Sequence, residues 1–82
     1  MNKIKVLFFA TLRQRAGMRS VELEVPADLR VKQLREKLGE EYPALRETLK
    51  VAVVSVNREF AFDDAIIPPE SEVAVFPPVS GG

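Results

Sequence analysis

The chain ends in two glycines, Gly81 and Gly82, and these residues point most directly to chemistry. The sequence holds only 4 glycines among 82 residues, so a terminal pair is a specific feature. Glycine has no Cβ, and such a tail can therefore lie extended in a channel too narrow for side chains. A carboxylate at Gly82 is inert as it stands, but activation by ATP to an acyl-adenylate makes it an electrophile for a thiol, a persulfide or an amine. We expect Gly82 to carry the reactive group; the alternative is a frayed end without function.

The sequence contains neither Cys nor His. These absences remove thiolate nucleophiles, disulfides, the common zinc sites and the most frequent general base. The adjacent carboxylates of Asp63 and Asp64 have no third ligand beside them in the sequence, and such a pair is typical of a turn. We therefore expect no metal, no bound cofactor and no catalytic machinery in the chain itself. Its chemistry would be that of a substrate or a binding partner within a larger complex.

Length and composition indicate one small globular domain of 9.2 kDa. Hydrophobic residues make up 46% of the chain and charged residues 29%, which argues against disorder. No apolar run approaches the ~20 residues that span a bilayer. The N-terminal residues lead directly into an alternating strand pattern and contain no secretory cleavage site. These features predict a cytoplasmic protein that does not bind membranes.

The formal net charge of zero conceals an uneven distribution. Residues 1–50 contain 11 Lys and Arg against 7 Asp and Glu, whereas residues 51–82 contain 1 Arg against 5 Asp and Glu. The acidic C-terminal part predicts an interaction with a basic partner, with solvated turn charges as the alternative. The Lys and Arg residues are spread over several elements without interleaved aromatic residues, so nucleic-acid binding is not expected.

Hydrophobic patterning predicts five extended segments. Apolar and polar residues alternate over residues 3–9, 20–25 and 72–76, which is typical of strands with one buried face. The uncharged run over residues 51–57 predicts a central strand that is buried on both faces. A short extended piece is expected over residues 60–62.

Three helical segments are predicted between these strands. Val31, Leu34 and Leu38 have the spacing of one helix face, and Gly39 is a plausible C-cap for that helix. The segment from Thr11 to Gln14 matches a capping box, which predicts a short helical turn beginning after Thr11. The last is a short piece in which Tyr42, Leu45 and Leu49 form an apolar stripe, and Pro43 suits its first turn.

Together these elements predict an α+β domain in two layers, with a mixed sheet of about four or five strands curled over one main helix. The first and last strands are both rich in apolar residues and are candidates to pair in the middle of that sheet. We expect the folded domain to cover residues 1–78 and to be followed by a flexible C-terminal tail, residues 79–82.

Three segments of the chain, residues 4–10, 56–57 and 72–82, closely resemble the small subunit of molybdopterin synthase, a family of ubiquitin-like sulfur carriers. The ending Phe-Pro-Pro-Val-Ser-Gly-Gly is the specific part of this resemblance, whereas residues 19–50 match only in general pattern. The resemblance implies the ubiquitin-like β-grasp topology.

The resemblance also implies a reaction. A ubiquitin-activating-like adenylating enzyme would consume ATP to adenylate Gly82, and a sulfur donor would then replace AMP to leave a C-terminal thiocarboxylate. The tail formed by Val79, Ser80 and Gly81 would thread into the large subunit of molybdopterin synthase. There the thiocarboxylate would supply sulfur to cyclic pyranopterin monophosphate, building the dithiolene of molybdopterin. In this family the synthase is a heterotetramer, with two large subunits and one carrier at each end.

Outward-facing aromatic residues form a second functional signal. The alternation places Phe9 opposite the core face of the first strand and Phe76 opposite the core face of the last. If these strands are neighbours, the two rings share an exposed face beside the tail, and Phe60 is a candidate to join them. We expect these three residues, together with Pro77 and Pro78, to form the partner-binding surface. The alternative is that the rings are covered by the chain itself or are isolated on the surface.

Three other functions share parts of this pattern. The first is a thiamine-type sulfur carrier with the same fold. The second is a ubiquitin-like modifier whose Gly82 is joined to lysines of target proteins, since only the nucleophile that attacks the adenylate differs. The third is a β-grasp interaction module with an inert tail, whose binding would not depend on Gly82. The sulfur donor, the activating enzyme and the number of pathways served are not specified by the sequence.

Overall fold

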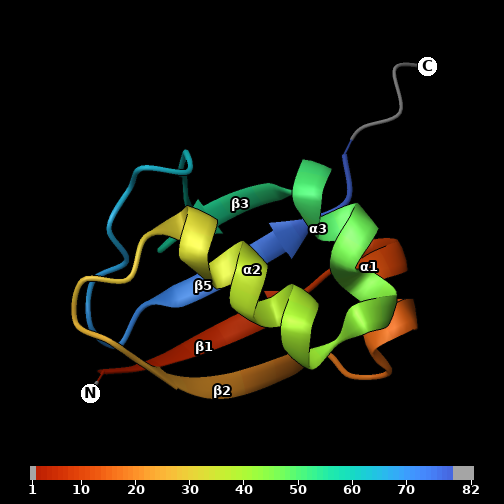
Figure 1. The fold of residues 1–82 in the computed structure, drawn as a ribbon, viewed down its shortest axis with the longest axis horizontal. Helices are drawn as coiled ribbons and strands as arrows, with labels where there is room; N and C mark the ends of the chain where they lie inside the picture. Colours follow the sequence, from red (N-terminus) through yellow and green to blue (C-terminus); the bar gives the residue numbers. More distant parts are fainter. Residues whose placement is uncertain (1, 79–82) are drawn as a thin grey trace.

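The computed structural model describes residues 2–78 of the chain. Within this range the chain forms five strands, three α-helices and one 3₁₀ helix (Figure 1). In chain order the elements are β1 (Asn2–Phe8), α1 (Ala10–Ala16), β2 (Ser20–Val25), α2 (Val31–Glu41), η1 (Pro43–Leu45), α3 (Arg46–Val51), β3 (Val53–Val56), β4 (Glu59–Phe60) and β5 (Glu72–Phe76).

The five strands form one mixed sheet in the order β2-β1-β5-β3-β4. β1 pairs antiparallel with β2 and parallel with β5, and β3 pairs antiparallel with both β5 and β4. α2 lies across one face of the sheet, in front of it in Figure 1. This is the β-grasp arrangement, and the predicted α+β fold with a mixed sheet over one main helix is confirmed.

The hydrophobic core lies between the sheet and the helices. Ile4, Val6 and Phe8 alternate along β1 and are buried, as the sequence pattern predicts. Complete burial of side chains of this size contributes about 1.5–3 kcal/mol each. The helices and their connections bury five leucines against them: Leu12, Leu34, Leu38, Leu45 and Leu49. The helices thus cover one face of the sheet, and the opposite face is accessible to solvent or to a partner.

The prediction of a central strand over residues 51–57, buried on both faces, is confirmed in part. β3 lies inside the sheet between β5 and β4, and Val54 and Ser55, on opposite faces of it, are both buried, but the strand is shorter than predicted and is not the middle one. Val51 ends α3 and is 60% exposed, and β3 is one strand away from the edge of the sheet. The central position belongs to β5, the last strand in the chain. A short apolar run does not by itself distinguish a strand from the end of a helix, because both bury apolar residues at this length.

The start of α1 also differs from the prediction. The helix begins at Ala10 with Phe9 as its N-cap residue, so Thr11 lies inside the first turn and the predicted capping box is wrong. The N–H of Phe9 donates a hydrogen bond of 3.2 Å to the carbonyl of Val75 in β5. The chain therefore passes from the sheet directly into the helix, without a linker in which Thr11 would cap it.

Gly39 was expected to end α2, but it lies inside the helix, which continues to Glu41 with Tyr42 as its C-cap residue. A Cβ atom built on Gly39 would lie 3.5 Å from Cγ of Arg46 in α3. This distance is an ordinary van der Waals contact, so the packing of α2 against α3 does not by itself require glycine at this position. The helix ends where Pro43 disfavours helical backbone in the residue before it.

Candidate docking face and reactive chain end

The described chain reaches Pro78, two residues beyond β5. Pro77 and Pro78 have no N–H to donate and therefore cannot extend the ladder of the sheet. Because β5 is the central strand, the chain leaves the fold from the middle of the sheet rather than from an edge. The predicted reactive residue and tail lie outside the described residues: Val79, Ser80, Gly81 and Gly82.

The strand register places one row of small and apolar side chains across the face of the sheet that the helices do not cover. Leu7 of β1 is the register partner of Ala74 in β5, and Ala74 is also the partner of Ser55 in β3. Ser55 in turn pairs with Phe60 of β4. Phe76 lies two residues beyond Ala74 on the same side of β5, toward the chain end. We call this region the aromatic half of the open face: Leu7, Phe9, Ser55, Phe60, Ala74 and Phe76.

Phe9 and Phe76 come from opposite ends of the chain and stack on each other. Their ring centroids lie 4.6 Å apart with an interplanar angle of 16°. Phe9 remains 40% exposed, and Phe76 is half-buried. The parallel pairing of β1 with β5 brings them together, and the stacked pair lies directly beside the point where the chain leaves the sheet.

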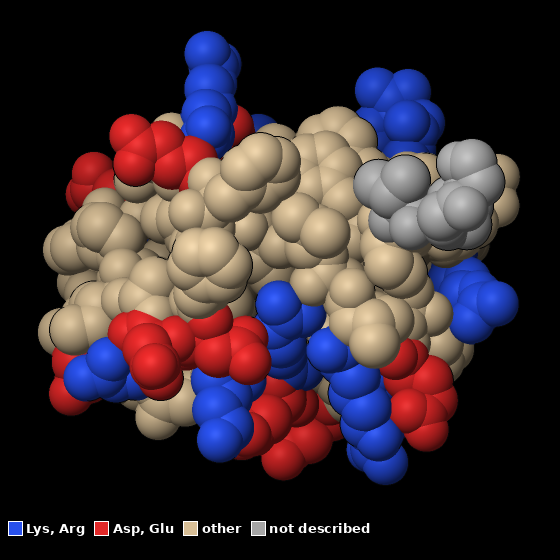
Figure 2. All heavy atoms as spheres, turned by 90° about the horizontal axis from the view of Figure 1, so that it is seen from above, with Lys and Arg blue, Asp and Glu red and all other residues tan. Residues whose placement is uncertain are grey.

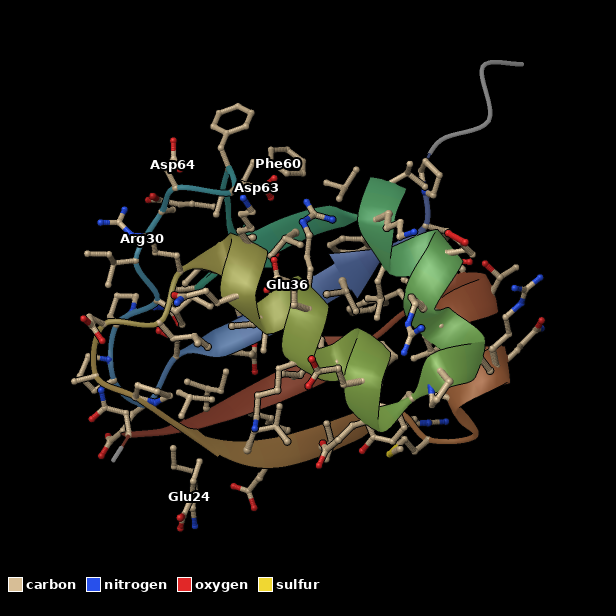
Figure 3. The ribbon with its side chains drawn as sticks, viewed as in Figure 1. Glu24, Arg30, Glu36, Phe60, Asp63 and Asp64 are labelled. Carbon is tan, nitrogen blue, oxygen red and sulfur yellow. The ribbon has the colours of Figure 1, made fainter. Side chains whose placement is uncertain are left out.

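Phe60 lies on the other side of the same row and is 78% exposed. In Figure 3 it projects from the edge of the sheet, away from α2. Figure 2 looks onto this edge and shows uncharged surface running across the view, with charged side chains gathered mainly along its lower border. A strongly exposed aromatic ring at a sheet edge is a feature that partner-binding surfaces use, because its burial in a complex contributes large contact area.

A shallow groove of about 350 Å³ lies between these aromatic walls. Ala74 and Ser55 form its floor, where their small side chains leave room between Phe60 on one side and the stacked pair on the other. Arg58 and Glu72 contribute the charged groups of its lining. The groove is therefore an apolar trough with charge at one end.

The other half of the open face carries charges instead of rings. Lys3 is the register partner of Glu24, and Lys5 lies between Glu22 on β2 and Glu72 on β5. Opposite charges at directly paired positions of neighbouring strands are favourable and remain hydrated. We call these five residues the charged half of the open face.

Asn57 anchors the turn that joins β3 to β4. Its backbone N–H donates to the carbonyl of Glu72 at 2.8 Å, and its Oδ1 accepts a hydrogen bond from the N–H of Glu72 at 2.9 Å. Its Nδ2 donates to Oγ of Ser71 at 3.2 Å. These three contacts fix the start of β5 against the end of β3, so the groove has a rigid end.

The Asp63–Asp64 pair lies in a turn, as predicted, and Asp63 has a structural partner. Arg35 donates from Nε to Oδ1 of Asp63 at 2.9 Å, and from Nη1 to the carbonyls of Leu49 and Ala52 at 2.7 and 2.6 Å. Arg35 therefore ties α2, the end of α3 and the loop after β4 together.

Two kinds of site are missing from residues 2–78. No three acidic side chains gather there closely enough to hold a metal ion. No helix in that range is long and apolar enough to cross a membrane.

The structure thus brings Phe9, Phe60 and Phe76 onto one surface beside Pro77, and it adds two residues that local sequence patterns do not predict. Ser55 and Arg58 line the groove although neither has a distinctive local pattern. The signal that was available is the alternation along β3, which places Ser55 on the side opposite Val54 and Val56.

Three comparisons relate this chain to known proteins. The model of the ThiS family matches residues 6–82. A molybdopterin synthase sulfur carrier subunit from Caenorhabditis briggsae is 39% identical over 84 residues, covering 100% of both chains. Among solved structures, small archaeal modifier protein 1 from Haloferax volcanii has a TM-score of 0.83 and 28% identity, covering 96% of this chain and 100% of that one.

A second solved structure shares the fold at lower identity. It is a complex of subunits 1 and 2 of the molybdopterin-converting factor from Helicobacter pylori, whose matching chain has a TM-score of 0.69 and 23% identity. The match covers 98% of this chain and 99% of that chain. With a family model over residues 6–82 and a curated relative matched from end to end, the chain belongs to the ThiS family of ubiquitin-like proteins, together with the molybdopterin synthase sulfur carrier subunits.

Proposed function

We propose that this chain is the sulfur carrier subunit of molybdopterin synthase. The observation that carries the proposal is the 39% identity to a carrier of that description over the whole of both chains. The ending Phe76-Pro77-Pro78 followed by Val-Ser-Gly-Gly, on a ubiquitin-like fold, supports the same role.

The proposed chemistry takes place at Gly82. A carboxylate oxygen attacks the α-phosphorus of ATP, an acyl–phosphate bond forms and pyrophosphate leaves. A sulfur donor at the oxidation level of sulfide then attacks the acyl carbon, and AMP leaves to give the thiocarboxylate. Transfer of that sulfur to a carbon of cyclic pyranopterin monophosphate, with water supplying the returning oxygen, regenerates the carboxylate. One tail carries one sulfur, so each dithiolene requires two loaded carriers.

The partners that this chemistry requires are the large subunit of molybdopterin synthase and an adenylating enzyme. The chain has no Cys and no His, so the groups that move protons and activate the pterin would come from these partners. The aromatic half of the open face is the proposed contact surface, since it lies beside the origin of the tail and is not matched by charges. The solved complex of subunits 1 and 2 of the molybdopterin-converting factor from Helicobacter pylori supports a large subunit as the partner.

The direct test is the intact mass of the protein after incubation with an adenylating enzyme, ATP and a sulfide source. We expect a gain equal to the replacement of one oxygen by sulfur, localised to Gly82 and absent without ATP. Addition of the large subunit and the pterin precursor should return the mass to its starting value while dithiolene forms. An unchanged mass with an enzyme that loads a known carrier in parallel would overturn the proposal.

A second candidate function is protein modification, and the likeness to small archaeal modifier protein 1 favours it specifically. In that case the amine of a target lysine attacks the adenylate in place of sulfur. The same incubation, carried out in a cell extract, separates the two functions. Covalent adducts that retain Gly82 in an amide bond would identify a modifier, whereas a thiocarboxylate without adducts would identify a sulfur carrier.

A further inference from the structure

Two charged residues line the groove, Arg58 and Glu72, and neither makes an ion pair within residues 2–78. Glu72 is the register partner of Lys5 on the same face of the sheet, whereas Arg58 lies in the turn between β3 and β4 and has no register partner. Arg58 makes no ion pair and no side-chain hydrogen bond with any other residue in the range 2–78. It is also the only cationic residue between Val51 and the end of the chain.

The backbone at Arg58 is strained. Asn57 and Arg58 have φ angles of 51° and 73°, so both adopt the left-handed conformation in the two-residue turn between β3 and β4. In turns of this kind glycine is strongly preferred at the second position, because a Cβ atom there is sterically unfavourable. Asn57 tolerates the conformation and has a structural role, since its side chain holds Ser71 and Glu72. Arg58 has no such contact, so no side-chain hydrogen bond within residues 2–78 accompanies the strain at this position.

The groove itself has the size of an apolar anchor site. Its volume of about 350 Å³ compares with the ~150 Å³ cavity that accepts benzene, so it has room for one or two apolar side chains. The walls of Phe9 and Phe60 and the floor of Ala74 provide contacts to such side chains. The guanidinium of Arg58 at the end of the groove matches a carboxylate, which it can bind through two parallel hydrogen bonds.

We propose that Arg58 is a recognition residue of the docking groove. The partner inserts an apolar side chain over Ala74 and Ser55, and a neighbouring carboxylate of the partner binds the guanidinium of Arg58. This inference rests on the proposed function, and the partner is accordingly the large subunit of the synthase. The aromatic walls supply contact area, while the charge pair selects the correct partner and the correct register.

The test measures the affinity of the full chain for the purified large subunit by calorimetry, together with thermal unfolding of each variant alone. Arg58→Gly should weaken binding by about tenfold or more. The same substitution should leave the unfolding temperature equal or higher, because glycine removes the backbone strain. Arg58→Lys keeps the charge but loses the two parallel hydrogen bonds, so it should weaken binding less than Arg58→Gly does, and Arg58→Glu should weaken binding more than Arg58→Gly does.

A matched control is available at Glu70, which has a φ of 58° in the turn before β5 and does not line the groove. Glu70→Gly should also relieve strain, but it should leave the affinity unchanged. Equal binding of the wild type and Arg58→Gly, or equal losses in Arg58→Lys and Arg58→Glu, would overturn the role of Arg58 and leave the proposed function intact. Failure of the wild-type chain to bind the large subunit would overturn both.

Discussion

The two halves of the open sheet face expose different kinds of side chain to solvent. In the charged half, Lys3 and Lys5 face glutamates on neighbouring strands, and this surface is stable in water without a cover. In the aromatic half, Phe9 stacks on Phe76 and Phe60 is left 78% exposed. Both halves include residues of β1 and β5, so the backbone of these two strands does not explain the difference. Only the half beside the origin of the C-terminal tail carries apolar surface that a partner would cover.

The largest effect should come from removing Gly82, which separates the chemistry at the chain end from docking on the sheet. The truncated chain should acquire no sulfur, because the remaining terminal carboxylate would stop one residue short of the adenylating site. Its free energy of unfolding should change by less than about 0.5 kcal/mol, since the hydrophobic core of the described chain is built from residues 4–75. Intact mass and thermal unfolding measure the two effects. Sulfur loading of the truncated chain would show that the position of the carboxylate is not critical.

Phe8 and Phe9 provide the sharpest test of the difference between the two faces of the sheet. Phe8 is 2% exposed and packs edge-on against Tyr42, with ring centroids 6.1 Å apart. Phe8→Ala should therefore cost about 3–5 kcal/mol of stability. Phe9→Ala removes mainly one stacked ring pair and should cost about 0.5–1.5 kcal/mol.

The affinity for the large subunit should show the opposite order, with a larger loss in Phe9→Ala than in Phe8→Ala. Phe9→Ala should lower the affinity by about 30-fold, as expected for an aromatic anchor near the centre of an interface. Denaturant unfolding gives the free energy of unfolding of each variant, and calorimetric titration gives its affinity for the large subunit. A loss of stability in Phe9→Ala as large as that in Phe8→Ala would mean that Phe9 belongs to the core and not to the docking face.

Substitution of Arg35 tests whether the hydrogen bonds that this residue makes on the helix side of the sheet affect only the stability of the fold. Arg35→Ala removes the donors to the carbonyls of Leu49 and Ala52 and the ion pair with Asp63. Two partly buried acceptors lose their partner, so the chain should lose about 1–3 kcal/mol of stability. The affinity for the large subunit, measured under conditions where the variant is folded, should be unchanged. Lys32→Ala, at an exposed position of the same helix, is the control and should have little effect on either quantity.

The smallest effect is expected in the charged half. Lys5→Ala should change stability by less than about 0.5 kcal/mol, because exposed charges away from caps and cores contribute little. Its affinity for the large subunit should stay within about twofold of the wild type, as expected outside the central contact area. A loss as large as that of Phe9→Ala would extend the docking surface across the whole sheet and remove the distinction between the two halves.

The sequence by itself determined features that depend on neighbouring residues. Alternation along the first strand identified Ile4, Val6 and Phe8 as core residues and left Phe9 outside. The same alternation placed Phe76 opposite Val75. The Gly-Gly ending predicts a reactive group at Gly82, which lies outside the described residues. Each of these inferences uses only the period of a strand or the chemistry of a side chain.

Tertiary structure decided the features that depend on which segments meet. The parallel pairing of β1 with β5 makes the last strand central and stacks Phe9 on Phe76. The direct passage from strand to helix overrides the Thr11 capping pattern, and α2 continues past Gly39 to Glu41. The groove and the strained Arg58 appear only when three strands are assembled side by side. Local patterns do not contain this information, because strand pairing is selected by contacts between residues far apart in the chain.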